Sequence, residues 1–339
     1  MNVFQAISRG FSLALGAPKL VLLLWLATVA AALPAALLVG DALADSFGTS
    51  LVAERMRQGF DMDWYGEFET SARGLEATFT PTLAGAGVVY DNLEGWWSGR
   101  MFAGRDEARP PAAGQSGSGQ PEGGFPGLLG LGVAFALGWA FLTGGVLERL
   151  ARPTEGLAFD RFAAAGGRYF WRFVRLALLS GVLYFLVYAL GRRLYRAIQE
   201  ATRDVTEERT ILLWIFLAAA LVVLLLHLVR MVFDYAKIAT VVDQRRSVLG
   251  SLRAAGRTVL RHPVKTCGVY LGFGVFAVLL LALYVLLAPG AGPASLPGIL
   301  LAFLFGQLYL ALRLFLRLGL LGGQLSLYRG SGEPGVSSG

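Results

Sequence analysis

The chain has 339 residues, of which 55% are hydrophobic and only 16% charged, and its mean hydropathy is +0.58. Soluble domains carry about a quarter charged residues, so this composition excludes an ordinary soluble globular domain. The single cysteine, Cys267, excludes an intrachain disulfide framework and a cysteine-rich metal site, and with only two histidines we expect neither a metal nor a cofactor.

Six stretches are apolar over about 20 residues, the length that an α-helix needs to cross a hydrocarbon core of roughly 30 Å. The first exceeds the apolar core of a signal peptide and follows another apolar, helix-like segment, so we interpret it as a crossing. The sequence therefore predicts an all-α polytopic membrane protein with six transmembrane helices. The six stretches are residues 20–40, 125–147, 173–190, 211–228, 266–287 and 296–318.

Basic residues are distributed unevenly between the segments that connect these stretches. The two terminal segments, with the connections after the second and fourth stretches, carry a net charge of +13, and the other segments carry −6. Short basic loops stay in the cytoplasm, so both termini are predicted to be cytoplasmic. Only three of the 30 basic residues are lysines, which favours a GC-rich bacterium and its cytoplasmic (inner) membrane. The division by membrane side disfavours nucleic acid as a partner.

A ten-residue pattern recurs along the chain. Residues 163–172 (AAAGGRYFWR) align with residues 252–261 (LRAAGRTVLR), which follow 89 residues later. A first copy starts near Ser8-Arg9-Gly10 if Pro18 corresponds to Pro263, and the first unit then has 67 extra residues in its external loop. Self-similarity at a fixed period indicates repeated structural units.

The ends of the second, fourth and sixth stretches follow the same period. Gly144-Gly145 lies 178 residues before Gly322-Gly323, with Phe233-Asp234 midway between them. We therefore predict three repeated transmembrane hairpins, each preceded by a basic interfacial helix.

The basic repeated segments have an amphipathic pattern. Val248, Leu252, Ala255 and Val259 recur at helical spacing among arginines. Such a helix lies in the headgroup plane and is attracted to anionic lipid. Topology and anchoring alone explain this pattern, whereas recognition of acidic lipid or of a partner's acidic surface is the functional alternative. The candidate anionic-lipid contacts are Arg245, Arg246, Arg253, Arg257, Arg261, Arg168 and Arg172.

The chain divides into five regions on this interpretation. Residues 1–40 hold the first interfacial helix and the first crossing, and 125–328 hold the remaining crossings. Residues 41–104 form an external insert with an amphipathic helix, a break at Pro81 and a second helix over 83–97. Residues 105–124 are rich in Gly, Pro, Ser and Gln and are predicted to be a flexible linker, and 329–339 a disordered tail.

The insert has two alternative roles. About 60 structured residues are too few for a robust independent core, so we expect its helices to pack on the bundle or at the outer interface. The acidic and aromatic run at residues 61–69 (DMDWYGEFE) is the best candidate for contact with another membrane protein, although carboxylates on a solvated helix face are commoner.

Motifs for catalysis are missing from the sequence. It contains no H-E-x-x-H, G-x-S-x-G, Walker or C-x-x-C pattern, so no residue is assigned a catalytic role. The glycine spacings within the apolar stretches indicate close helix contacts rather than a nucleotide-binding loop.

One polar constellation falls near membrane depth. His227, Arg230 and Asp234 share one face of the fourth crossing and its extension, and Arg313 and Arg317 lie near the end of the sixth. Ionisable groups at such depth are costly and indicate function. We expect Asp234 to pair with Arg313 or Arg317 and consider His227 a proton-sensitive group. Snorkelling arginines, a histidine bonded to a backbone carbonyl and a packing ion pair are the structural alternatives.

Two segments resemble a known class of membrane protein. The six crossings, the repeated basic helix, residues 233–238 (FDYAKI) and the run from Ser251-Leu252 to His262-Pro263 are similar to uncharacterised bacterial proteins. Those proteins are akin to the membrane domain attached to some glycerophosphodiester phosphodiesterases. The resemblance covers most of the chain outside the insert, and it implies no hydrolase residues because the catalytic barrel is not in this sequence. We expect a non-enzymatic scaffold, accessory or lipid-handling role, with a transporter using the Asp234 region as the alternative.

Overall fold

The computed structural model describes residues 1–47, 52, 54–55, 61–71, 125–153, 158–203, 207–288 and 295–331. The regular structure within these residues is entirely α-helical. The helices are α1 (Val3–Leu15), α2 (Pro18–Phe47), α4 (Met62–Ser71), α6 (Phe125–Ala151), α7 (Phe159–Ala201), α8 (Glu208–Val242), α9 (Val248–Arg261), α10 (Pro263–Leu287) and α11 (Leu296–Ser331).

Six of these helices, α2, α6, α7, α8, α10 and α11, are long and apolar enough to cross a membrane. Each contains one of the six predicted stretches, so the prediction of an all-α chain with six candidate spans is confirmed. Many of their large apolar side chains point outward, among them Leu178, Phe185 and Leu286. Lipid is the natural cover for such side chains, and the chain is a multi-pass membrane protein.

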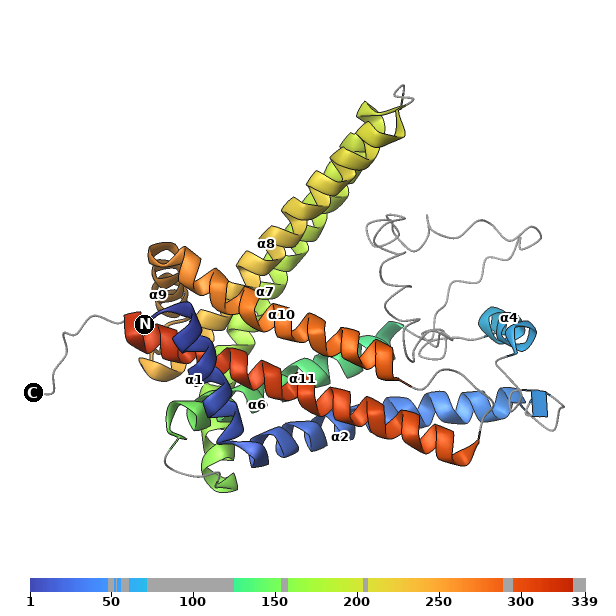
Figure 1. Cartoon of the computed structure of the whole chain (residues 1–339), viewed down its shortest axis with the longest axis horizontal. Coiled ribbons are helices and arrows are strands. Elements are labelled where there is room, and N and C mark those ends of the chain that lie inside the picture. Colours follow the sequence, from blue (N-terminus) through green and yellow to red (C-terminus); the bar gives the residue numbers. More distant parts are fainter. Residues whose placement is uncertain are drawn as a thin grey trace, which may run out of the picture.

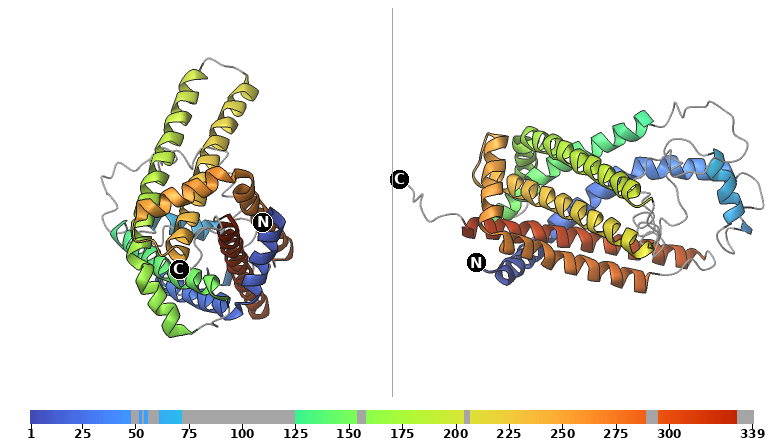
Figure 2. Two further views of the ribbon diagram at one scale, coloured as in Figure 1. Left: turned by 90° about the vertical axis from the view of Figure 1, so that its left-hand side faces the viewer. Right: turned by 90° about the horizontal axis from the view of Figure 1, so that it is seen from above.

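The candidate spans extend from one common end. Figure 1 shows α1, α9, the first turns of α7 and the last turns of α11 at one end, and α4 at the other end. We call the end formed by residues 1–15, 159–172 and 243–261 the basic end. The α7 and α8 hairpin leans away from α2, α10 and α11 in Figure 1, whereas Figure 2 shows that all the spans run in the same general direction.

Each basic segment packs on the end of the preceding hairpin. The start of α7 meets the end of α6, where a Cβ added to Gly144 would lie 3.1 Å from the Gly166 Cα. The start of α9 meets the end of α8, where the buried Thr240 hydroxyl donates to Ser251 Oγ at 2.9 Å. The first basic segment, α1, packs in the same way on the end of the last hairpin, where Gly10 meets α11, so the two ends of the chain are in contact.

Local capping sets where two of these segments begin. The Asn2 side chain accepts a hydrogen bond from the Gln5 amide, and the Gln5 side chain accepts one from the Asn2 amide, so α1 starts with a capping box. Ser247 caps α9 by accepting from the Gly250 amide. Both caps satisfy amides that the first turn of a helix leaves unpaired.

The prediction of three separate interfacial helices is wrong for the second unit. The chain breaks between α1 and α2 at Pro18, and between α9 and α10 at Pro263, whereas α7 runs without interruption from Phe159 to Ala201. The residue that corresponds to Pro263 in the second unit is Val174, which keeps its backbone amide. The basic segment of that unit is therefore the first part of its crossing helix.

The described part of the insert packs on the end of α2. Trp64 of α4 is 4% exposed, packs against Phe47 with ring centroids 4.7 Å apart and donates to Ser46 Oγ at 3.1 Å. Asp61 accepts from the amides of Asp63 and Trp64 and so caps α4. The acidic and aromatic run thus has an internal structural use. The predicted helix over 83–97, the linker over 105–124 and residues 332–339 of the tail lie outside the described residues, and α11 continues to Ser331.

Candidate functional site

Asp234 lies on α8 at the side that faces the last hairpin, and its side chain is only 15% exposed. Lys237 Nζ donates to Asp234 Oδ1 at 3.1 Å, and the Tyr270 hydroxyl donates to Oδ2. Arg230 Nε is 4.0 Å from Oδ2, at the limit of an ion pair. The carboxylate is therefore held by its own helix and by α10, which belongs to the next hairpin.

The predicted pairing of Asp234 with Arg313 or Arg317 is wrong. The ion pairs of Asp234 among the described residues are with Lys237 and Arg230. The Arg317 guanidinium instead lies over the Trp139 ring, 4.3 Å from its centroid, which links α11 to α6.

His227 and Arg313 are exposed on their helices. His227 Nδ1 lies 3.0 Å from the Val223 carbonyl oxygen, one turn earlier on α8. This contact matches the structural alternative for His227, a ring bonded to a backbone carbonyl, and not a proton-sensitive pair with another side chain. The structure therefore joins Arg230 and Asp234, while His227 and Arg313 lie apart from them on the helix surfaces.

The candidate lipid-contacting arginines lie at the basic end. Six of the seven are exposed, and Arg172 is half-buried. On α9 the buried face consists of Ser251, Ala255 and Val259, so Arg253 and Arg257 point away from the bundle. The large apolar side chains of Leu249 and Leu260 are also exposed on this outward side of α9.

Some of these arginines also have structural partners. Arg172 Nη1 donates to the Arg245 carbonyl at 3.3 Å and joins α7 to the turn before α9. Arg245 Nε donates to Asp243 Oδ2 at 2.8 Å, and this hydrogen bond raises the pKa of Arg245. The same Asp243 oxygen accepts from the Tyr328 hydroxyl at 2.8 Å. Asp243 thus ties α8, the α9 turn and α11 together at the basic end.

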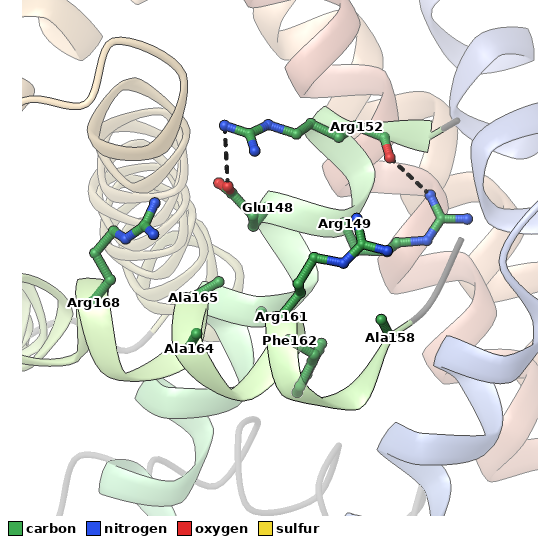
Figure 3. A pocket seen from close by; sticks show the side chains of 10 residues that line it. Glu148, Arg149, Arg152, Ala158, Arg161, Phe162, Ala164, Ala165 and Arg168 are labelled. Carbon is green, nitrogen blue, oxygen red and sulfur yellow. Dashed lines mark hydrogen bonds and ion pairs between the residues drawn. The ribbon is translucent and has the colours of Figure 1, made fainter. Parts of the chain in front are cut away.

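A basic cleft between the end of α6 and the start of α7 was missed by sequence reasoning, which singled out only its Arg168. Its volume is about 150 Å³, and Figure 3 shows the side chains that line it. Arg149, Arg152, Arg161 and Arg168 bring four guanidinium groups to the cleft, and Glu148 brings one carboxylate. The sequence signal for this cleft is the run from Glu148 to Arg152, which places two arginines directly after the second apolar stretch.

Among the described residues, no group of three His, Cys, Asp or Glu side chains is arranged to hold a metal ion. Comparison of the chain with protein-family models, curated proteins and solved structures finds no match.

Proposed function

We propose that the chain is a non-enzymatic, lipid-binding platform of the bacterial inner membrane, with its basic end and both termini in the cytoplasm. The observation that carries the proposal is the outward face of α9. Leu249 is 73% exposed and Leu260 is 80% exposed, and they flank Arg253 and Arg257. A helix with apolar side chains beside arginines partitions to the headgroup layer, where anionic lipid attracts it.

The other basic segments support the same placement. Phe4 on α1 and Trp171 on α7 are strongly exposed at the basic end. Tryptophan is enriched at the membrane–water interface, where its apolar ring and polar N–H are both accommodated, and the apolar Phe4 ring suits the acyl side of the same interface. Three such segments around one end give a surface that binds lipid over a wide area.

Lipid retention tests the proposal. The full-length protein is extracted in mild detergent, and the retained phospholipids are measured by native mass spectrometry. We expect anionic phospholipid to be retained over zwitterionic phospholipid, and Arg253→Gln with Arg257→Gln to reduce that preference. The matched control changes Arg193 and Arg196, which are exposed at the far end of α7. Equal retention of both lipid classes by the wild-type protein would refute the proposal.

Orientation has its own test. In a Cys267→Ser background, Arg246→Cys should react with a membrane-impermeant thiol reagent only after the cells are permeabilised, because short basic loops are cytoplasmic. Gln115→Cys, in the predicted external linker, should react in intact cells. The reverse pattern would place the basic end outside.

The scaffold role and the family resemblance belong to this proposal too. A stable partner recovered with the full-length chain in mild detergent would support a scaffold, whereas recovery of a lone chain would leave lipid handling as the function. The similarity to the membrane domain of glycerophosphodiester phosphodiesterases agrees with a protein that works beside lipid headgroups.

Transport is the second candidate, favoured by the burial of Asp234 between two hairpins. A transport site needs water or substrate to reach the carboxylate, whereas a packing ion pair does not. Modification by a hydrophobic carbodiimide, which reacts with protonated carboxyl groups, separates the two. Labelling of Asp234 in native membranes would support transport, and unreactive Asp234 would support the structural role.

A further inference from the structure

We propose that the cleft between α6 and α7 is a binding site for a phosphate group, supplied by the headgroup of an anionic phospholipid or by a soluble phosphate compound. This inference deepens the proposed lipid-binding function and rests on it for the lipid source. Its basis is separate from the α9 face, because the cleft is formed by other helices.

The cleft concentrates positive charge from two segments of the chain. Arg149 and Arg152 lie on the last turns of α6, and Arg161 and Arg168 lie on the first turns of α7. Close packing of the two helices at Gly144 and Gly166 brings these segments together. Like charges gathered at one place repel each other, so an anion bound there offsets a cost that the fold already carries.

The one lining carboxylate is already engaged. Glu148 Oε1 is 3.4 Å from Arg152 Nη2, and Glu148 Oε2 accepts from the Tyr169 hydroxyl at 3.4 Å. Figure 3 shows Arg152 reaching back to Glu148, one turn earlier at the end of α6. Among the residues that line the cleft there are four guanidinium groups and one carboxylate, so the lining itself carries a net positive charge.

Arg149 provides an independent indication of a ligand. Its Nη1 donates to the Arg152 carbonyl at 3.3 Å, whereas its Nε is buried and has no hydrogen-bond partner among the described residues. A buried charged donor without a partner is costly. The planar guanidinium of arginine fits phosphate oxygens with two parallel hydrogen bonds, so a phosphate group is the ligand that this donor set suits best.

Size and position agree with a phosphate group. A volume of about 150 Å³ accommodates several water molecules, each of which takes about 30 Å³, and so it can accommodate one phosphate group. The four arginines lie outside the apolar stretches predicted to cross the membrane, 125–147 and 173–190, so we expect them at the depth of lipid headgroups. An acyl chain attached to the phosphate could then enter the bilayer beside the cleft.

The test compares arginines in the cleft with arginines outside it. Arg149→Gln with Arg168→Gln should lower the retention of anionic phospholipid by the full-length protein about tenfold, as expected for the loss of charge-assisted hydrogen bonds. Arg175→Gln, exposed on α7 and outside the cleft lining, is the matched control and should retain lipid like the wild type. Circular dichroism of each variant reports folding. If the double variant does not fold, lipid retention is measured for Arg168→Gln alone, because Arg168 is exposed.

Two ligands distinguish the sources of the phosphate. If vesicles of anionic phospholipid raise the unfolding temperature of the wild type but not of the cleft variant, and inorganic phosphate has no effect, the ligand is a headgroup. If inorganic phosphate alone has that effect, the ligand is a soluble phosphate compound. A cleft variant that retains lipid and responds to both ligands like the wild type would overturn the inference. If the α9 variant loses lipid and the cleft variant does not, the proposed lipid-binding function stands and the phosphate site in the cleft is refuted.

Discussion

Replacement of Gly10 by alanine tests the contact that joins the two ends of the chain. A Cβ at this position would lie 2.3 Å from the Gly319 carbonyl oxygen and 2.9 Å from the Gly323 amide nitrogen. Both are backbone atoms of α11, so no side-chain rotation relieves the clash. Favourable contact requires about 3.5 Å, and α1 would therefore have to move outward by about 1 Å.

We expect Gly10→Ala to destabilise the protein by about 1–3 kcal/mol, the usual cost of overpacking. At about 2–4 °C per kcal/mol, the unfolding temperature should fall by several degrees. Because membrane proteins often unfold irreversibly, variants are compared at one scan rate in one detergent. Gly256→Ala is the matched control, since it follows Ala255, the repeat equivalent of Gly10, and nothing lies within 4 Å of its added Cβ.

The control should unfold at the wild-type temperature or slightly above it, because alanine favours the helix by about 0.5–1 kcal/mol over glycine. Protease digestion gives a second measurement, in which α1 should become more susceptible in Gly10→Ala and remain protected in Gly256→Ala. If Gly10→Ala unfolds at or above the wild-type temperature with α1 still protected, the reasoning about the α1 and α11 contact is refuted.

Three further substitutions test the internal contacts. Tyr270→Phe removes the hydroxyl that donates to Asp234 and should cost about 1.5–3 kcal/mol in thermal unfolding; an unchanged unfolding temperature would deny that the contact between α8 and α10 is stabilising. Thr240→Val removes the bond to Ser251 and should cost about 1 kcal/mol, with faster amide hydrogen exchange in α9; unaltered exchange would count against it. Trp64→Ala should release α4 from the end of α2 and expose it to proteolysis; unchanged protection of α4 would contradict this prediction.

The crossings were predictable because membrane depth imposes a simple rule on sequence. Apolar runs of about 20 residues must be helical, and each predicted run lies within one observed helix. Boundaries depended on finer chemistry. Pro18 and Pro263 start new helices at the expected places. The aligned residue in the second unit is Val174, which keeps its backbone amide, so the helix continues there although the repeat alignment predicted a break.

The contacts of Asp234 within its own helix could be predicted from the sequence, whereas its contacts with other helices could not. The depth and burial of Asp234 follow from its place on α8, and Lys237 at i+3 was within reach of helical periodicity. Tyr270 was not, because its approach to Asp234 depends on how α10 is rotated and how closely it packs on α8. The attraction of Arg317 to Trp139 likewise depends on tertiary packing, and aromatic faces leave no charge signal in a sequence.

The closing contact between α1 and α11 sets an order on assembly. The contacts of α7 with α6 and of α9 with α8 join neighbouring segments, which can pack as soon as each pair has been inserted. The contact of Gly10 with Gly319 and Gly323 spans nearly the whole chain, and contacts of such separation form late. Until α11 is inserted, α1 can meet only Gly268 and Gly272 of α10, through Val3 and Ile7, and its face of Ala6, Gly10 and Ala14 lacks the glycines of α11. An amphipathic helix in that position is best accommodated at the membrane interface, so α1 is expected to wait there and dock only when the last hairpin completes the bundle.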